Sequence, residues 1–102
     1  MIKQLKTLVN YHEGQIASRS LSKKLDVANS VTLYAMAKGE SISRESSNNT
    51  KLIYVLEGQL QLKIIDERFE LTADDLKSIS AHSLHDFLAM ENCKFLQIEF
   101  SE

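Results

Sequence analysis

The chain has 102 residues, a formal net charge of −2, an apolar share of 43% and a charged share of 25%. These values are typical of one soluble globular domain, and a chain of this length can bury roughly two thirds of its unfolded surface. They argue against nucleic-acid binding, because no run of lysine or arginine is available to track a phosphate backbone. We expect no membrane association either, since no apolar run approaches the length of about 18 residues that a span needs and the N-terminus lacks a signal-peptide core.

Cysteine usage points to a reducing compartment. Cys93 is the only cysteine, so no intrachain disulfide is possible and a cytoplasmic location is the simplest expectation. No catalytic arrangement is visible around Cys93, which we interpret as a small, half-buried apolar residue.

The N-terminal 25 residues give a mixed pattern. The stretch "MIKQLKTLV" suits either a helical turn or a strand, whereas "GQIASRSL" predicts an edge strand. From residue 30 onward, strict alternation of apolar and polar residues dominates, first in "SVTLYAMA", then in "LIYVLEG" and "QLQLKII". The shorter stretches "RFEL", "DLKSIS" and "HDFLAM" follow, and "KFLQIEF" comes last.

Turn signals separate these alternating stretches at short intervals, among them "KGE", "ESSNNT", "EGQ" and "ADD". About seven short strands with hardly any helix predict an all-β fold, an antiparallel sandwich or barrel. We expect a single domain over residues 1–102, with an N-terminal segment and edge strand at 1–25 and the barrel core at 30–100.

The spacing of the residues that follow Gly39 resembles the first motif of the cupin superfamily, in its small single-domain form. That motif reads Gly, five residues, His-x-His, three residues, Glu, six residues, Gly. Here Gly39, Glu45-x-Ser47, Lys51 and Gly58 keep the same intervals. The resemblance implies a double-stranded antiparallel barrel of the jelly-roll type, related to the RmlC-like cupins.

The family's second motif reads Gly, five residues, Pro-x-Gly, two residues, His, three residues, Asn. Asp74, Ser80, His82, His85 and Ala89 fall at these intervals. The usual glycine of the turn is His82 here, so a positive φ at His82 would carry a conformational cost. The resemblance spans roughly residues 14–100.

Carried over position by position, the four metal ligands of the family become Glu45, Ser47, Lys51 and His85. A serine hydroxyl is a poor ligand for a divalent transition metal, and an ammonium group at the carboxylate position would repel the ion. We therefore predict no cofactor. If a divalent transition metal binds at all, Glu45 and His85 are the residues expected to hold it.

The same positions predict a metal-free site. The resemblance implies that Glu45, Lys51 and His85 project into one cavity, and we expect Ser47, Tyr34 and Met36 to line it. A lysine–glutamate pair there would offset the cost of burying either charge. The competing interpretation is that residues 45–49 form a solvated hairpin tip, with the Lys51 side chain extending to water from its base. His12 and His82 are expected to be surface loop residues.

Three functions follow as alternatives. The first is metal-independent binding or sensing of a small molecule in the barrel. The second is a small enzyme, an isomerase or lyase with His85 as the catalytic residue, either metal-free or with a metal held by Glu45 and His85. The third is a degenerate barrel that acts only as a dimerisation scaffold. In each case we expect a homodimer, because a second subunit could cover the apolar strand face of Leu52, Tyr54 and Leu56.

Overall fold

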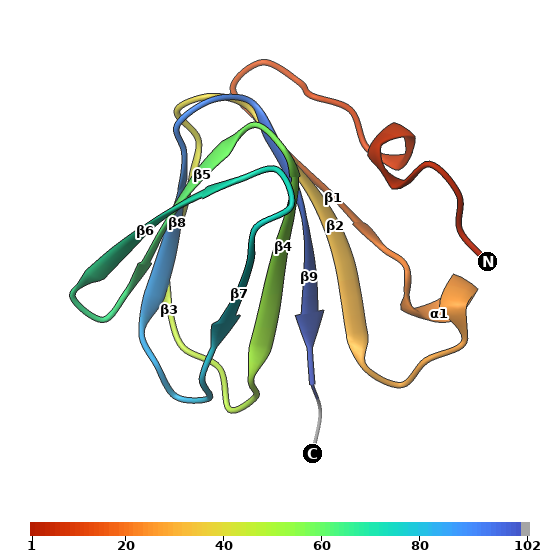
Figure 1. Cartoon of the computed structure of the whole chain (residues 1–102). Coiled ribbons are helices and arrows are strands. Elements are labelled where there is room, and N and C mark those ends of the chain that lie inside the picture. The colour runs from red at the N-terminus through yellow and green to blue at the C-terminus, as the bar shows by residue number, and fades with distance from the viewer. Residues whose placement is uncertain (101–102) are drawn as a thin grey trace.

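The protein folds as two antiparallel sheets packed face to face (Figure 1), seen in a computed structural model that describes residues 1–100. Two short helices, η1 (Leu5–Leu8) and α1 (Ser22–Leu25), flank the first strand. The strands are β1 (Ile16–Ser20), β2 (Ser30–Met36), β3 (Ser41–Glu45), β4 (Lys51–Glu57), β5 (Gln59–Ile64), β6 (Glu67–Thr72), β7 (Leu76–Ile79), β8 (His85–Ala89) and β9 (Cys93–Glu99). No helix within the described residues has the length and apolar character needed to cross a membrane.

The strand order is that of a jelly roll, which confirms the expected all-β fold. One sheet has the order β1-β2-β9-β4-β7, and the other has the order β3-β8-β5-β6. The stretch "GQIASRSL" is an edge strand as predicted, and "MIKQLKTLV" contains the helical turn η1 rather than a strand. The sheets do not close into a continuous cylinder, because β6 and β7 are edge strands of different sheets.

The space between the sheets is filled by side chains of the chain itself. Alternation places one face of every long strand inward, where burial of apolar area supplies the main stabilising free energy. This interior cluster consists of Met36, Ile53, Val55, Leu60, Leu62, Leu71, Ile79, Phe87, Ala89, Cys93 and Phe95, with Tyr34, Ile42, Ile64 and Phe69 packed against it.

A second apolar cluster lies on the outer face of the five-stranded sheet. Its buried members are Val9, Leu21, Val31, Leu33 and Ala35. The N-terminal segment covers this part of the sheet and is held by the Tyr11 hydroxyl, which donates to Glu57 Oε2 at 2.7 Å. Burial and the neighbouring Glu57 carboxylate raise the pKa of Tyr11, so the donor proton stays in place. Residues 1–11 thus belong to the folded domain.

Both glycines of the first motif have a positive φ, 88° at Gly39 and 86° at Gly58. At Gly58 a β-carbon would lie 2.0 Å from the Asn92 carbonyl oxygen, so only glycine fits the turn from β4 to β5. The two glycines therefore lie in the turns on either side of the β3–β4 segment, which carries Glu45 and Lys51 and crosses from one sheet to the other.

Candidate functional site

Side chains from β3, β4 and β8 converge at one end of the sandwich. Glu45 is the last residue of β3, Lys51 the first of β4 and His85 the first of β8. The β3–β4 and β7–β8 loops meet at this end, where the backbone N–H of His82 donates to the Ser47 carbonyl at 2.7 Å. The loop contact brings three positions of the two motifs into one polar cluster.

A β-bulge in β3 decides which side chain faces His85. Ile42 lies opposite Phe87, but the register shifts between Ile42 and Glu45, so that Glu45 pairs with His85. Without the extra residue, Arg44 would occupy this place. Bulges commonly re-aim a side chain in this way. The carboxylate of Glu45 therefore lies on the same face as the buried imidazole.

Lys51 is the centre of the polar cluster. Its Nζ lies 3.2 Å from Glu45 Oε1, 3.1 Å from His85 Nε2 and 3.8 Å from Glu99 Oε1. Glu99 is the direct partner of Lys51 in the β4–β9 ladder. The residue is only 4% exposed, so its ammonium does not extend to water. We define the polar cluster as Glu45, Lys51, His85 and Glu99. Within it, Lys51 is buried and lies between the other three residues.

His85 is enclosed, with 1% of its surface exposed. Its Nδ1 lies 2.9 Å from the Ser83 carbonyl oxygen, which only accepts hydrogen bonds, so Nδ1 carries the proton. In the neutral imidazole Nε2 is then an acceptor, and it faces the Lys51 ammonium. Both ring nitrogens are therefore occupied by the protein itself.

The two carboxylates lie at the rim of the polar cluster. The side chains of Glu45 and Glu99 are 47% and 29% exposed. Tyr34 lies near both and stacks on Phe95 with a centroid distance of 4.9 Å. Burial raises the pKa of the Tyr34 phenol, and the charges of Glu45 and Glu99 raise it further. The phenol thus remains a neutral group beside two anions.

The other expected lining residues have different places. Ser47 lies in the β3–β4 loop, where its Oγ accepts a hydrogen bond from the Asn49 N–H at 3.0 Å. Met36 is fully buried in the interior cluster. His12 and His82 are exposed in loops, and φ at His82 is 69°. Cys93 is buried, and burial raises the pKa of its thiol to about 12, as suits an unreactive core residue.

Closely packed rings lie behind the polar cluster, toward the interior of the sandwich. Lys51 and His85 close the end, and the rings of Phe87 and Phe95 stack directly behind them, with His85 edge-on to Phe87 at 5.7 Å. Within the described residues every buried side-chain nitrogen and oxygen has a hydrogen-bond partner. The buried polar atoms of the cluster thus all have partners within the protein, and Lys51 and His85 are enclosed rather than exposed to a cavity.

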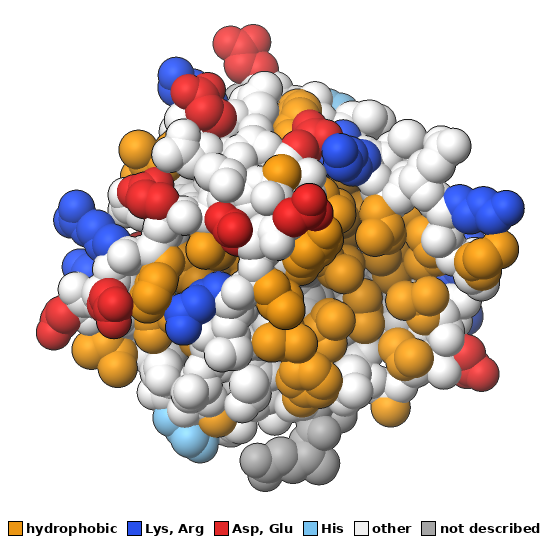
Figure 2. Space-filling view, in the orientation of Figure 1, with side chains coloured by type: hydrophobic (Ala, Val, Ile, Leu, Met, Phe, Trp, Pro, Cys, Tyr) orange, Lys and Arg blue, Asp and Glu red, His pale blue; other side chains and the backbone are white. Residues whose placement is uncertain are grey.

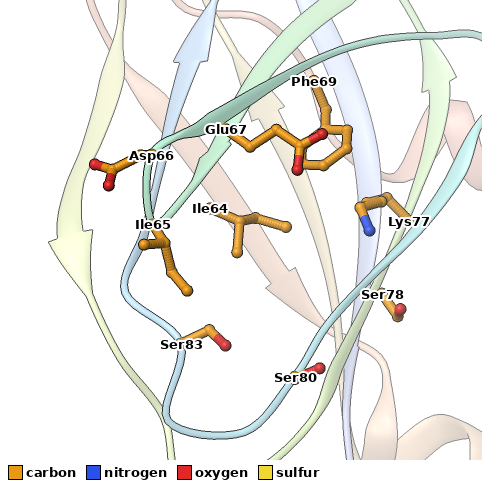
Figure 3. Close-up of a pocket in the computed structure, with 9 residues that line it drawn as sticks. All are labelled: Ile64, Ile65, Asp66, Glu67, Phe69, Lys77, Ser78, Ser80 and Ser83. Atoms are coloured by element: carbon orange, nitrogen blue, oxygen red, sulfur yellow. The ribbon is translucent and has the colours of Figure 1, made fainter.

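A cleft of about 460 Å³ opens instead between the edge strands β6 and β7 (Figure 3). Ile64, Ile65 and Phe69 form one side, and Lys77 with nearby serines forms the other. The Lys77 Nζ lies 4.6 Å from the centre of the Phe69 ring. The cleft adjoins the polar cluster, because Ile64 pairs with His85 and the Ser83 carbonyl accepts the His85 proton.

The family profile described as "Cupin domain" matches residues 32–99, which is more than half of the chain. The chain belongs to the cupin-domain family. No curated protein matches it.

Solved structures resemble this one over 70% to 100% of its length. A conserved protein of unknown function from Streptococcus pyogenes is 22% identical, with a TM-score of 0.90 over 100% of this chain and 88% of that one. A cupin superfamily protein from Desulfitobacterium hafniense is 25% identical, with a TM-score of 0.84 over 94% and 86%. An RmlC-like cupin from Shewanella frigidimarina is 17% identical, with a TM-score of 0.67 over 70% and 64%. These likenesses establish the fold and leave the activity open.

Sequence reasoning brought Glu45, Lys51 and His85 together, but it did not include Glu99, Phe69 or Lys77. Glu99 shares a strand face with Cys93 and Phe95, which are buried in the interior cluster, whereas its alternation with Leu96, Ile98 and Phe100 predicts the opposite, solvent-facing orientation. Its contact with Lys51, however, depends on β9 lying beside β4, and this neighbour relation is set by the chain topology.

Proposed function

We propose that this cupin binds a small molecule without a transition metal. The observation that carries the proposal is the position of the Lys51 ammonium between Glu45, His85 and Glu99. In the family resemblance this position belongs to a metal-binding carboxylate. A lysine there supplies a fixed positive charge that pairs with both carboxylates and donates to the imidazole.

The donor set does not suit a divalent metal. Within residues 1–100 no group of three or more His, Cys, Asp or Glu side chains is arranged to hold one. An ion bound to both Glu45 and His85 would lie about 2 Å from each. It would meet the Lys51 ammonium, which already lies 3.2 Å and 3.1 Å from the same two atoms. We therefore derive no step that involves a metal.

A ligand would bind at the surface of the sandwich rather than inside it. The interior cluster fills the barrel, and the end of the sandwich is closed by Lys51 and His85. The cleft between β6 and β7 is the hollow that adjoins the polar cluster. Its volume lies within the range of small-molecule sites.

Catalysis by His85 receives less support. A general base must reach the proton that it abstracts, directly or through one water. His85 is 1% exposed, and its two nitrogens are engaged by Ser83 and Lys51. We assign His85 the role of holding the polar cluster together.

A second candidate function is a dimerisation scaffold, and the filled interior favours it. Figure 2 shows a broad apolar region over β4, β9 and β2, bordered by charged side chains. Cross-strand neighbours on this outer face include Leu96, Tyr54 and Leu76, the last of which is 62% exposed. Such a continuous apolar face commonly marks an interface, and a second copy of the chain is the partner we propose.

Elemental analysis tests the metal-independent proposal. The protein is purified without chelator or metal column, beside a His85→Ala variant, and iron, manganese, nickel, copper and zinc are measured. We expect a metal content well below one ion per chain in both. A stoichiometric ion in the wild type that is lost in the variant would overturn the proposal.

A further inference from the structure

The turn at the rim of the β6–β7 cleft contains a residue ill suited to its backbone. The two-residue turn between β5 and β6 consists of Ile65 and Asp66, and φ at Ile65 is 56°. A positive φ in such a turn is normally supplied by asparagine or glycine, and a β-branched residue there is a true outlier. Ile65 is also 59% exposed. The position thus carries both backbone strain and exposed apolar surface.

Strain of this kind tends to gather where it serves binding. Ile65 continues the apolar wall of the cleft that Ile64 and Phe69 form, as the close-up shows (Figure 3). The backbone N–H of Ile65 donates to the Leu84 carbonyl at 2.8 Å, which fixes the turn against the β7–β8 loop. Asparagine would relieve the strain but remove the apolar surface from the rim.

The opposite wall offers hydrogen-bond donors that the protein does not use. Among the described residues no carboxylate lies within ion-pair distance of Lys77, whose ammonium is positioned over the Phe69 ring. The cleft is also lined by three serines whose hydroxyl groups form no hydrogen bond within residues 1–100: Ser78, Ser80 and Ser83. One cation and several hydroxyls beside an apolar wall suit an anion with an apolar body.

The charge at the rim limits how strongly negative that anion can be. Among the described residues that line the cleft Lys77 is the one cation, while Asp66 and Glu67 lie at the edge of the cleft. In Figure 3 the Asp66 carboxylate points away from the cleft and Glu67 extends toward Phe69. A dianion such as a phosphate monoester would exceed the single positive charge of Lys77 and would also be repelled by Glu67. A monocarboxylate is better matched to this balance.

We propose that the cleft between β6 and β7 binds a small monocarboxylate with an aromatic or branched aliphatic body. The carboxylate accepts from the Lys77 ammonium and from the Ser80 and Ser83 hydroxyls, while the body packs against Ile64, Ile65 and Phe69. This inference rests on the proposed metal-independent binding function and gives it a site and a ligand class.

The test is an NMR titration of ¹⁵N-labelled protein with phenylacetate, with phenylacetamide and acetate as control ligands. We expect saturable shifts of the Ile65, Phe69, Lys77 and Ser83 amides, in the millimolar range usual for so small a probe. The neutral amide lacks the charge and acetate lacks the apolar body, so both should shift these amides far less. Saturable binding elsewhere, no saturable shift, or an equal response to either control would overturn the proposal.

Three variants refine the test. Lys77→Gln is expected to weaken phenylacetate binding about fivefold or more, as the loss of a charged hydrogen bond does. Ile65→Asn is expected to raise the thermal midpoint, because it relieves the backbone strain, and to weaken binding, because it removes apolar surface from the cleft. Both effects together are expected if the strain is retained because it serves binding. Asp26→Gly, at another position of positive φ, should raise the midpoint and leave binding unchanged. Unchanged binding in both cleft variants would contradict the proposal.

Elemental analysis does not depend on the result of the titration. A failure of the cleft proposal is therefore distinguishable from a failure of the metal-independent function.

Discussion

The Lys51 Nζ lies 3.1 Å from the Nε2 of His85, and both residues are almost fully enclosed. A buried ammonium is costly unless its donors find partners, and here Glu45, Glu99 and His85 provide them. The pair thus depends on the carboxylates at the rim as much as on each other. Removal of Lys51 therefore leaves Glu45, Glu99 and His85 without the group that neutralises or donates to them.

Replacement of Lys51 by methionine tests this dependence. We expect Lys51→Met to lower the free energy of unfolding by about 1–3 kcal/mol, because it leaves the buried His85 acceptor without its donor and the two partly exposed carboxylates without their counter-charge. Urea denaturation followed by circular dichroism measures the change. The double variant Lys51→Met/Glu45→Gln should lose less than the two single losses added together. Strict additivity would show that the polar cluster is not energetically coupled.

A single substitution should turn the polar cluster into a metal site. Lys51→Glu removes the ammonium and leaves Glu45, Glu99, His85 and the new carboxylate around one point, a donor set that suits zinc. We expect added Zn²⁺ to raise the thermal midpoint of this variant and to leave that of the wild type unchanged.

The control for the metal prediction is Lys51→Glu combined with His85→Ala, in which the zinc effect should shrink. An equal midpoint shift in the wild type would mean that Lys51 does not exclude the ion. In that case the role assigned to Lys51 as an internal replacement for the metal would be wrong.

The motif spacing predicted this site only in part. Two glycines with positive φ mark the turns before β3 and after β4, so the ends of the segment that carries Glu45 and Lys51 follow from local sequence. The β-bulge that aims Glu45 at His85 leaves no sequence signal, and neither does the pairing of Lys51 with Glu99. Met36 and Tyr34 share one strand face, yet only Tyr34 lies near the polar cluster, because Met36 is deeper in the barrel. The cleft was missed since its walls come from edge strands of two different sheets.

His82 takes the positive φ that the family assigns to glycine, at 69°. We expect His82→Gly to raise the free energy of unfolding by about 0.5–1 kcal/mol, since relief of the backbone strain exceeds the added entropy of the unfolded chain. The side chain is exposed, so no packing is lost. Gly58→Ala is the opposite case and should destabilise strongly, because its β-carbon would overlap Asn92. If His82→Gly instead destabilised the protein, the His82 imidazole would have to make a stabilising contact that outweighs the backbone strain.

Tyr34 predicts a loss of stability at alkaline pH. Burial, with the charges of Glu45 and Glu99, raises the pKa of this phenol above its ordinary value of 10.0. In the unfolded chain the phenol ionises near that ordinary value, so above it the unfolded state binds fewer protons than the native state. The stabilising contribution is therefore complete below pH 10.0 and is lost as the pH rises toward the native pKa.

Unfolding of wild type and Tyr34→Phe from about pH 8 to about pH 11 measures this contribution. Both proteins share the other titrating groups, so the difference between them isolates Tyr34. We expect the variant to lose less stability over this interval. Parallel curves would mean that the phenol ionises equally readily in the folded and unfolded chains.

The outer face of the five-stranded sheet predicts the assembly state. Leu76 is 62% exposed and lies beside Tyr54 on this face, so Leu76→Glu should cost the isolated subunit little while placing a charge in the interface. We expect the wild type to sediment as a dimer and Leu76→Glu to sediment as a monomer at the same concentration. Leu84→Glu is the matched control, because Leu84 is 47% exposed in the β7–β8 loop, and it should remain dimeric. A monomeric wild type, or dissociation by the control variant as readily as by Leu76→Glu, would rule out this face as the interface and remove the support for a scaffold function.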